Sequence, residues 1–169
     1  MAQLILDIGS GTPYKWHIPI QGKNIIHVDI DKTAFHLEVV CSIYDLPLKD
    51  NSIPIVHVSH VLEHLENPFR ALQELKRILK NVAIIKVPNA SFWKVRPSGM
   101  ENHIFSWNEW TLKTFLNRVF ENVQIKYTSR WSIFDNSKFS IFEKIKRMVE
   151  RGFFGQSELT AVCRAKIDH

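Results

Sequence analysis

The sequence lacks the features that mark secreted or membrane-spanning proteins. Its 169 residues include only two cysteines, Cys41 and Cys163, far apart and each within a short apolar run. Disulfides are typical of secreted chains, so we expect both cysteines to be free thiols in a reducing compartment. No signal peptide precedes the first expected strand, and no apolar run approaches the ~20 residues that a membrane-spanning helix requires. These absences predict a cytoplasmic location.

Internal repeats, low-complexity tracts and linker-like stretches are also missing from the sequence. A chain of this length can bury a substantial core, so we expect a single domain over residues 1–169. The net charge of +5 mildly favours an acidic partner such as nucleic acid or an anionic membrane surface. An ordinary solvated surface explains that charge equally well.

The most informative stretch opens the chain. Residues 4–8 form a nearly continuous apolar run, which is typical of a strand buried on both faces of a parallel sheet. Gly9 and Gly11 follow, and glycine can adopt positive φ and let a ligand approach the backbone. Asp7 is an acid at the carboxyl end of this strand, where ligands of open α/β sheets bind. An ordinary tight turn after a core strand would have the same sequence.

Strand and helix patterns then alternate along the chain, which favours a parallel sheet covered by helices on both faces. In the last expected strand, over 158–167, apolar and polar residues alternate, as in an antiparallel or edge strand. The earlier expected strands are residues 25–28, 37–43, 53–58, 82–87 and 123–127.

Two helices have recognisable starts. Asn67 is a good N-cap, Pro68 suits the first helical position, and apolar residues recur at helical spacing up to Leu79. A second helix is expected to begin at Ser106, with Glu109 completing a capping box.

Residues 129–157 separate the last two strands and predict an inserted helical element. One face of this segment carries an apolar stripe, and the other face is basic over 138–151. A helix that packs its stripe on the domain is one interpretation. A lid, a substrate platform or a membrane-surface contact is the other.

Several motifs coincide in order and spacing. They are L-I-L-D-I-G-S-G-T over 4–12, I-I-H-V-D-I-D over 25–31, S-I-Y-D-L-P-L-K-D-N-S-I over 42–53, V-S-H-V-L-E-H-L-E-N-P over 58–68 and E-L-K-R-I-L-K over 74–80. Together they resemble the class I S-adenosylmethionine-dependent methyltransferases of the small, type 11-like group. This resemblance implies a Rossmann-like three-layer α/β sandwich, with a seven-stranded, mostly parallel sheet whose last strand is antiparallel.

The resemblance also implies that S-adenosyl-L-methionine binds across the carboxyl ends of the first strands. Asp29 would accept hydrogen bonds from the ribose hydroxyls, and it follows Gly11 at close to the roughly 20-residue spacing of dinucleotide folds. The other cofactor-binding residues that it implies are Asp7, Gly9, Ser10, Gly11, Ile30, Ser42, Ile43, Ser59 and His60.

The sequence departs from the family at three points. Pro13 stands near the usual third glycine, Ser42 stands where an aspartate is common, and helices ahead of the first strand are missing. These departures leave open a methyltransferase-like subunit that binds or scaffolds without catalysis.

Two other chemistries share parts of the pattern. His60 to His64 match H-x-x-E-H, a zinc-peptidase pattern in which a helix would hold zinc between the two histidines. The run follows a buried strand beside a glycine loop, so we do not favour a metal and expect no metal ligands. A nicotinamide-dependent dehydrogenase would share the glycine loop, but Tyr14 replaces the third glycine of its motif.

The acceptor is the least defined part. We expect a small-molecule or lipid-linked acceptor, with nucleic acid as an alternative suggested only by the charge, and a homodimer is left open. Orienting the acceptor can supply much of the rate, and oxygen or acidic carbon acceptors also need a base. His64 and His103 are the candidate catalytic residues, and structural or solvated histidines would look the same.

Overall fold

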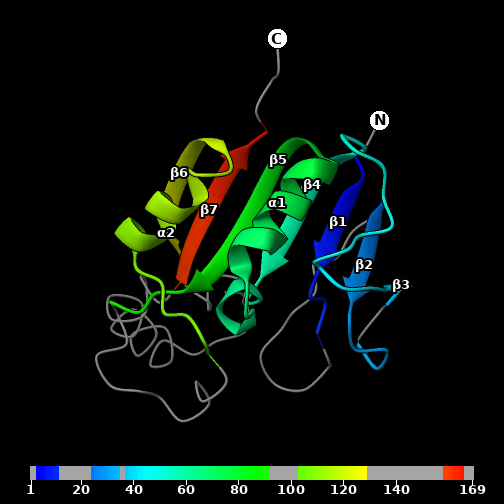
Figure 1. The fold of residues 1–169 in the computed structure, drawn as a ribbon, viewed down its shortest axis with the longest axis horizontal. Helices are drawn as coiled ribbons and strands as arrows, with labels where there is room; N and C mark the ends of the chain where they lie inside the picture. The colour runs from blue at the N-terminus through cyan, green and yellow to red at the C-terminus, as the bar shows by residue number, and fades with distance from the viewer. Residues whose placement is uncertain (1–2, 12–23, 35–36, 92–102, 129–157, 166–169) are drawn as a thin grey trace, which may run out of the picture.

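The computed structural model describes residues 3–11, 24–34, 37–91, 103–128 and 158–165. In these residues one seven-stranded sheet carries the fold, in the order β3-β2-β1-β4-β5-β7-β6 (Figure 1). The strands are β1 (Ile5–Ile8), β2 (Ile25–Asp29), β3 (Val39–Val40), β4 (Ile53–Ser59), β5 (Leu79–Pro88), β6 (Glu121–Thr128) and β7 (Glu158–Arg164). The expected helical element over 129–157 lies outside the described residues.

Strand direction agrees with the prediction. Strands β1 to β5 are parallel to one another, and β7 lies between β5 and β6 and is antiparallel to both. The predicted Rossmann-like α/β fold, mostly parallel with an antiparallel last strand, is therefore confirmed. The third apolar run gives only the short edge strand β3, because the chain turns back at residues 42–45, where the N–H of Asp45 donates to the carbonyl of Ser42.

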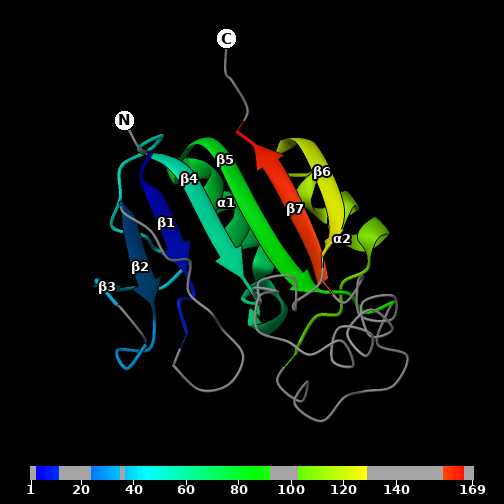
Figure 2. The same ribbon diagram turned by 180° about the vertical axis from the view of Figure 1, so that it is seen from behind.

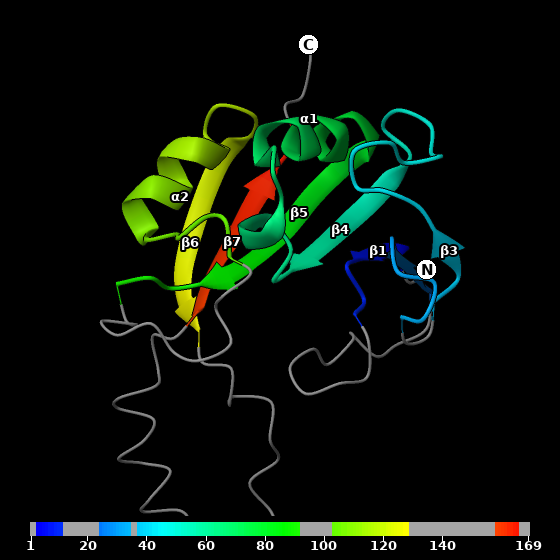
Figure 3. The same ribbon diagram turned by 60° about the horizontal axis from the view of Figure 1, so that its bottom comes forward.

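The described helices cover one face of the sheet. These helices are α1 (Pro68–Ile78) and α2 (Glu109–Leu116), and both lie in front of the sheet in Figure 1 and behind it in Figure 2. A tilted view places both above the sheet (Figure 3). Burial along β5 alternates accordingly, because Ala83, Ile85 and Val87 are fully buried whereas the residues between them are only partly buried.

Helix α1 begins as predicted and packs the core. The side chain of Asn67 accepts from the N–H of Arg70, and Pro68 is the first helical residue. The inward stripe of α1 is completely buried with the sheet residues and consists of Ala71, Leu72, Leu75 and Ile78. This packing is the main stabilisation of the helix, since short helices are marginal alone.

The predicted start of α2 at Ser106 is wrong. Asn108 is the N-cap, and Thr111 rather than Glu109 completes the capping box. The reason is Trp107, which is buried and forms an isolated parallel bridge with Asn89, while its carbonyl accepts from the N–H of Ala90. This extended backbone delays the helix until the residues after Trp107.

Both cysteines are free, as predicted. Cys163 is buried in β7, and burial raises the pKa of its thiol to about 12, so it stays protonated at neutral pH. Cys41 is only partly buried. Among the described residues, no helix has the length and hydrophobicity to cross a lipid bilayer.

The buried stripe of α1 gives a direct test of this packing. Leu72→Ala should lower the free energy of unfolding by about 2–5 kcal/mol, because it leaves a cavity under the helix. Urea unfolding followed by circular dichroism measures the change. The exposed neighbour Gln73 supplies the control, since Gln73→Ala should change stability by less than about 0.5 kcal/mol. Equal losses from both substitutions would contradict the assigned face of α1.

Candidate functional site

The glycine loop lies at the carboxyl end of β1 and folds over the end of β2. The N–H of Gly9 donates to the carbonyl of Val28 at 2.8 Å, and the N–H of Gly11 donates to Oδ2 of Asp29 at 2.9 Å. Both glycines have positive φ, 76° and 74°, which other residues adopt only with strain. The loop therefore depends on glycine at both positions and on the Asp29 carboxylate.

Gly9 serves protein packing directly. A Cβ added at Gly9 would lie 2.2 Å from Cγ2 of Val61, in the segment that follows β4. The space that the missing side chain leaves is therefore filled by Val61. We predicted Gly9 as a cofactor-binding residue, and the structure adds a packing reason for that glycine.

Asp29 has acceptor capacity left after it holds the loop. Its Oδ1 accepts from the N–H of Asp31 at 2.9 Å and its Oδ2 accepts from Gly11, one hydrogen bond to each oxygen. An ionised carboxylate offers about four lone-pair sites, so two remain. The next residue, Ile30, exposes 73% of its surface. An acceptor beside an exposed apolar side chain suits a nucleoside, which has hydroxyls on its sugar and a flat apolar base.

Ser10 supplies a further polar group in the loop. Its side chain is buried, and its Oγ has no hydrogen-bond partner among the described residues. Buried hydroxyls normally have partners, so an orphan one is a reasonable contact for a ligand. The residues Ser10, Asp29 and Ile30 therefore fit an adenosyl cofactor, although none of them identifies one.

Asp7 has a different setting from the predicted one. It lies within β1, is completely buried, and pairs with two histidines of the flanking strands. His27 Nδ1 lies 3.0 Å from Oδ2 of Asp7, and His57 Nδ1 lies 2.7 Å from Oδ1. The sequence analysis missed both histidines. Their matching positions near the ends of neighbouring parallel strands could have indicated that they flank Asp7.

The predicted adenine-side residues are arranged by a turn. Ser42 Oγ accepts from the N–H of Tyr44 at 3.2 Å, and the side chain of Ile43 is buried in the core. Only the backbone of Ile43 could therefore face a ligand. The turn is tied to α1, because the Tyr44 hydroxyl accepts from the N–H of Asn67 and Arg70 lies over the Tyr44 ring at 5.5 Å.

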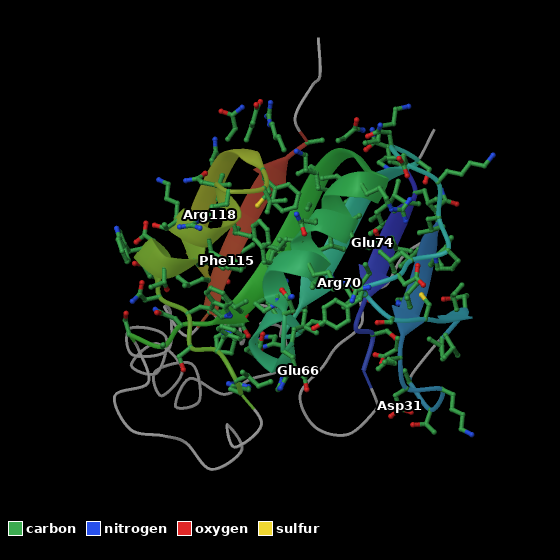
Figure 4. The ribbon with its side chains drawn as sticks, viewed as in Figure 1. Asp31, Glu66, Arg70, Glu74, Phe115 and Arg118 are labelled. Atoms are coloured by element: carbon green, nitrogen blue, oxygen red, sulfur yellow. The ribbon has the colours of Figure 1, made fainter. Side chains whose placement is uncertain are left out.

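A salt-bridge cluster fixes the loop that follows this turn. Arg77 donates to Glu74, to Asp50 and to the carbonyls of Leu46 and Leu48, at distances between 2.6 and 3.0 Å. Figure 4 shows Arg70 and Glu74 along α1. The loop over residues 46–50, which follows the Ser42 turn, is therefore held against α1 by charge-assisted hydrogen bonds.

The turn after β4 carries Ser59 and His60. Ser59 is buried at the end of β4, and His60 has a φ of 54°. The His60 ring lies between two carboxylates, with Nε2 at 3.1 Å from Glu158 and Nδ1 at 3.2 Å from Glu63. Burial alone would lower the pKa of His60, but its interactions with the Glu158 and Glu63 carboxylates outweigh burial and raise the pKa to about 9. His60 is thus a charged link between β7 and the turn.

The two candidate catalytic histidines lie side by side. His64 ends the 3-10 helix η1 (Leu62–His64), and its ring centroid lies 4.7 Å from that of His103. Burial is the main cause that lowers the pKa of His103, the charges of His64 and His60 lower it further, and Glu63 opposes them. A neutral imidazole at pH 7 is suited to accept a proton.

These residues gather at one end of the sheet. The parallel strands β1, β2, β4 and β5 all end there, and Figure 4 places Asp31 and Glu66 at that end. The structure therefore brings the glycine loop, Asp29 and the turn after β4 to the edge where the sequence predicts the site.

A family model matches part of the chain. Residues 6–85 match the model of a methyltransferase domain. This match confirms the resemblance to the class I S-adenosylmethionine-dependent methyltransferases that the motifs carry. The match ends within β5, so it covers the glycine loop, Asp29, Ser42 and the turn after β4 but not His103.

Two curated proteins share parts of the methyltransferase sequence. An uncharacterised methyltransferase of Schizosaccharomyces pombe is 54% identical over 39 residues, which are 23% of this chain and 14% of that protein. An uncharacterised protein of Methanocaldococcus jannaschii is 37% identical over 84 residues, 46% of this chain and 36% of that protein. The chain thus spans well under half the length of these relatives.

Solved structures share the methyltransferase fold. A putative methyltransferase from Haloferax volcanii, solved in complex with the Trm112 methyltransferase activator, has a TM-score of 0.69 at 19% identity and covers 99% of this chain and 83% of its own. An S-adenosylmethionine-dependent methyltransferase from Archaeoglobus fulgidus has a TM-score of 0.61 at 20% identity, with coverage of 96% and 86%. At these identities the likeness concerns the fold.

The contact between Gly9 and Val61 can be tested in this methyltransferase domain. Gly9→Ala should destabilise the protein by about 1–3 kcal/mol, because the backbone has positive φ and the new Cβ meets Val61. Adding Val61→Ala should relieve the clash but not the strain, so the double variant should lose less than the sum of the single losses. Chemical unfolding of all three variants measures this coupling. Strictly additive losses would show that the two residues do not touch.

Proposed function

We propose that this chain binds S-adenosyl-L-methionine and transfers its methyl group to a small-molecule or lipid-linked acceptor. The observation that carries the proposal is Asp29, a half-buried carboxylate at the end of β2 with lone pairs left for the ribose hydroxyls. The matched methyltransferase domain supports the choice of cofactor. A structural neighbour, a phosphoethanolamine N-methyltransferase of Haemonchus contortus, is itself described with S-adenosyl-L-methionine bound.

Each predicted residue has a place in this proposal. Asp29 holds the ribose, Ile30 covers the adenosine, and Ser42 with the backbone of Ile43 borders the adenine. The glycine loop, with Asp7 behind it, lies beside the methionine part, and Ser59 and His60 border the methyl donor. His64 and His103 are the candidate bases, and the lowered pKa of His103 keeps its imidazole neutral and able to take a proton at pH 7.

A second candidate function is that of a methyltransferase-like subunit that acts with a partner protein. The Haloferax volcanii neighbour, which was solved with its activator, favours it. The edge strand β3 offers a surface for such a partner, since Val40 exposes 56% of its side chain there. Calorimetry with S-adenosylmethionine and with its demethylated product separates the candidates, because a non-catalytic scaffold need not bind either. A third possibility, a nucleic-acid acceptor, predicts binding that weakens steeply as salt rises.

The ribose assignment predicts a selective loss. Asp29→Ala should weaken the affinity for S-adenosylmethionine by about an order of magnitude or more, because charge-assisted hydrogen bonds are lost. Asp31→Ala is the matched control, since Asp31 is exposed and its side chain accepts from Thr33. Isothermal titration calorimetry of both variants, after a check of folding by circular dichroism, measures the difference. An affinity that Asp29→Ala leaves unchanged would refute the assignment.

A further inference from the structure

A compact group of possible metal ligands lies beside the proposed methyl-donor region. One ligand atom each from Glu63, His64 and His103 lies within 4.8 Å of the other two. Glu63 and His64 belong to η1, directly after β4, whereas His103 arrives from the segment that precedes α2. Two parts of the chain that are far apart in sequence therefore converge on a single point.

The Glu63 carboxylate gives the second, independent observation. The side chain is completely buried, and neither of its oxygens makes a hydrogen bond of acceptable geometry among the described residues. Its Oε1 forms an ion pair with Nδ1 of His60 at 3.2 Å, but that imidazolium is shared with Glu158, and Oε2 has no partner among the described residues. No lysine or arginine of the described residues forms a salt bridge with Glu63. A buried carboxylate in this condition is costly unless a cation or a donor satisfies it.

Backbone hydrogen bonds hold the three ligands in place. The carbonyl of Glu63 accepts from the N–H of Ile104 at 2.7 Å and from the N–H of Phe105 at 3.1 Å, which brings His103 next to η1. Leu62 is completely buried and anchors the other side of the turn. The backbone thus sets the approach of His103 to the buried Glu63, and the exposed His64 follows Glu63 directly in η1.

We propose that Glu63, His64 and His103 form a binding site for a divalent transition-metal ion. One carboxylate oxygen and two imidazole nitrogens are a donor set that suits zinc and its neighbours, whereas magnesium and calcium prefer oxygen alone. Ligand bonds of about 2.0–2.2 Å place donor atoms at most about 4.3 Å apart, so small side-chain movements close the site. Three protein ligands leave positions for water or substrate.

This site differs from the zinc-peptidase arrangement that H-x-x-E-H suggests, and from the expectation that no residue binds a metal. In that arrangement His60 and His64 are the ligands and Glu63 is the base. Here His60 lies before η1 with positive φ and faces Glu158, and His103 takes the place of the second histidine. The sequence predicted His103 as a candidate base but could not pair it with Glu63, because no local pattern connects the two residues.

The ion would lie at the end of the sheet where the cofactor is proposed to bind. With the ion bound, His64 and His103 would act as ligands rather than as bases, and the ion would polarise an acceptor oxygen and lower the pKa of an attached hydroxyl. This role rests on the proposed methyl transfer. Metal binding itself does not rest on it. The experiment below therefore measures binding without cofactor or acceptor, so that failure of one proposal leaves the other intact.

The test is calorimetric titration of the chelator-treated protein with Zn²⁺. We expect one ion per chain in the micromolar range or tighter, and Glu63→Gln should weaken binding by at least about tenfold, because the substitution removes the charged ligand but keeps the shape. Glu66→Gln is the matched control, since Glu66 is exposed and lies outside the group. It should leave the affinity unchanged.

A second variant and a second probe keep the result decisive. His103→Ala should also weaken Zn²⁺ binding, and circular dichroism shows whether each variant is folded. Titration with Co²⁺ should give visible absorption from imidazole and carboxylate coordination in the wild-type protein and lose it in both variants. The proposal is overturned if Zn²⁺ does not bind at millimolar concentration, if folded Glu63→Gln and His103→Ala bind as well as wild type, or if Mg²⁺ competes equally.

Discussion

The contact of Gly9 with Val61 joins the two halves of the proposed site. The glycine loop belongs to β1, and Val61 belongs to the turn between β4 and η1. Because glycine leaves no side chain between them, the loop that is proposed to face the cofactor lies directly on the turn that carries His60, Glu63 and His64. Neither half can shift without the other, since dense packing transmits displacements. The position of the glycine loop and the positions of the candidate metal ligands in η1 are thus coupled through this contact.

Asp29 adds the second constraint. Its carboxylate receives the N–H of Gly11 from one side and the N–H of Asp31 from the other. The residue therefore shapes the loop before any ligand arrives, and a ribose would meet a carboxylate already held in place. Such preorganisation lowers the entropy lost on binding. The same residue type at the same position serves both the fold and the proposed recognition.

Much of this architecture could be predicted from local patterns. The apolar runs predict the strands, and the Asn67-Pro68 pair predicts the start of α1. The alternation over β7 predicts an antiparallel or edge strand, and β7 is antiparallel but lies inside the sheet, between β5 and β6. The prediction failed at Ser106, where the nearby bridge of Trp107 to Asn89 overrides a plausible capping box. Local sequence patterns report on one segment at a time, so they could not predict a bridge that joins two segments.

The same reasoning explains what was found and what was missed at the site. Asp29 follows Gly11 at close to the spacing of a known motif, so the sequence alone predicts that the two residues belong to one site. His103 approaches Glu63 only because two backbone N–H groups donate to the Glu63 carbonyl, and no spacing rule encodes that. The two histidines beside Asp7 were likewise hidden, since their relation appears only once three strands are aligned.

That alignment has a consequence for folding. Asp7 is buried at the centre of the sheet, and the strands bring His27 and His57 opposite it in register. If β2 or β4 slipped by one residue, the imidazole of that strand would turn to the other face of the sheet and be replaced by an aliphatic neighbour, so the buried Asp7 carboxylate would lose that ring. The native register of these parallel strands is therefore favoured over a slipped one, because only the native register places both imidazoles beside the buried carboxylate.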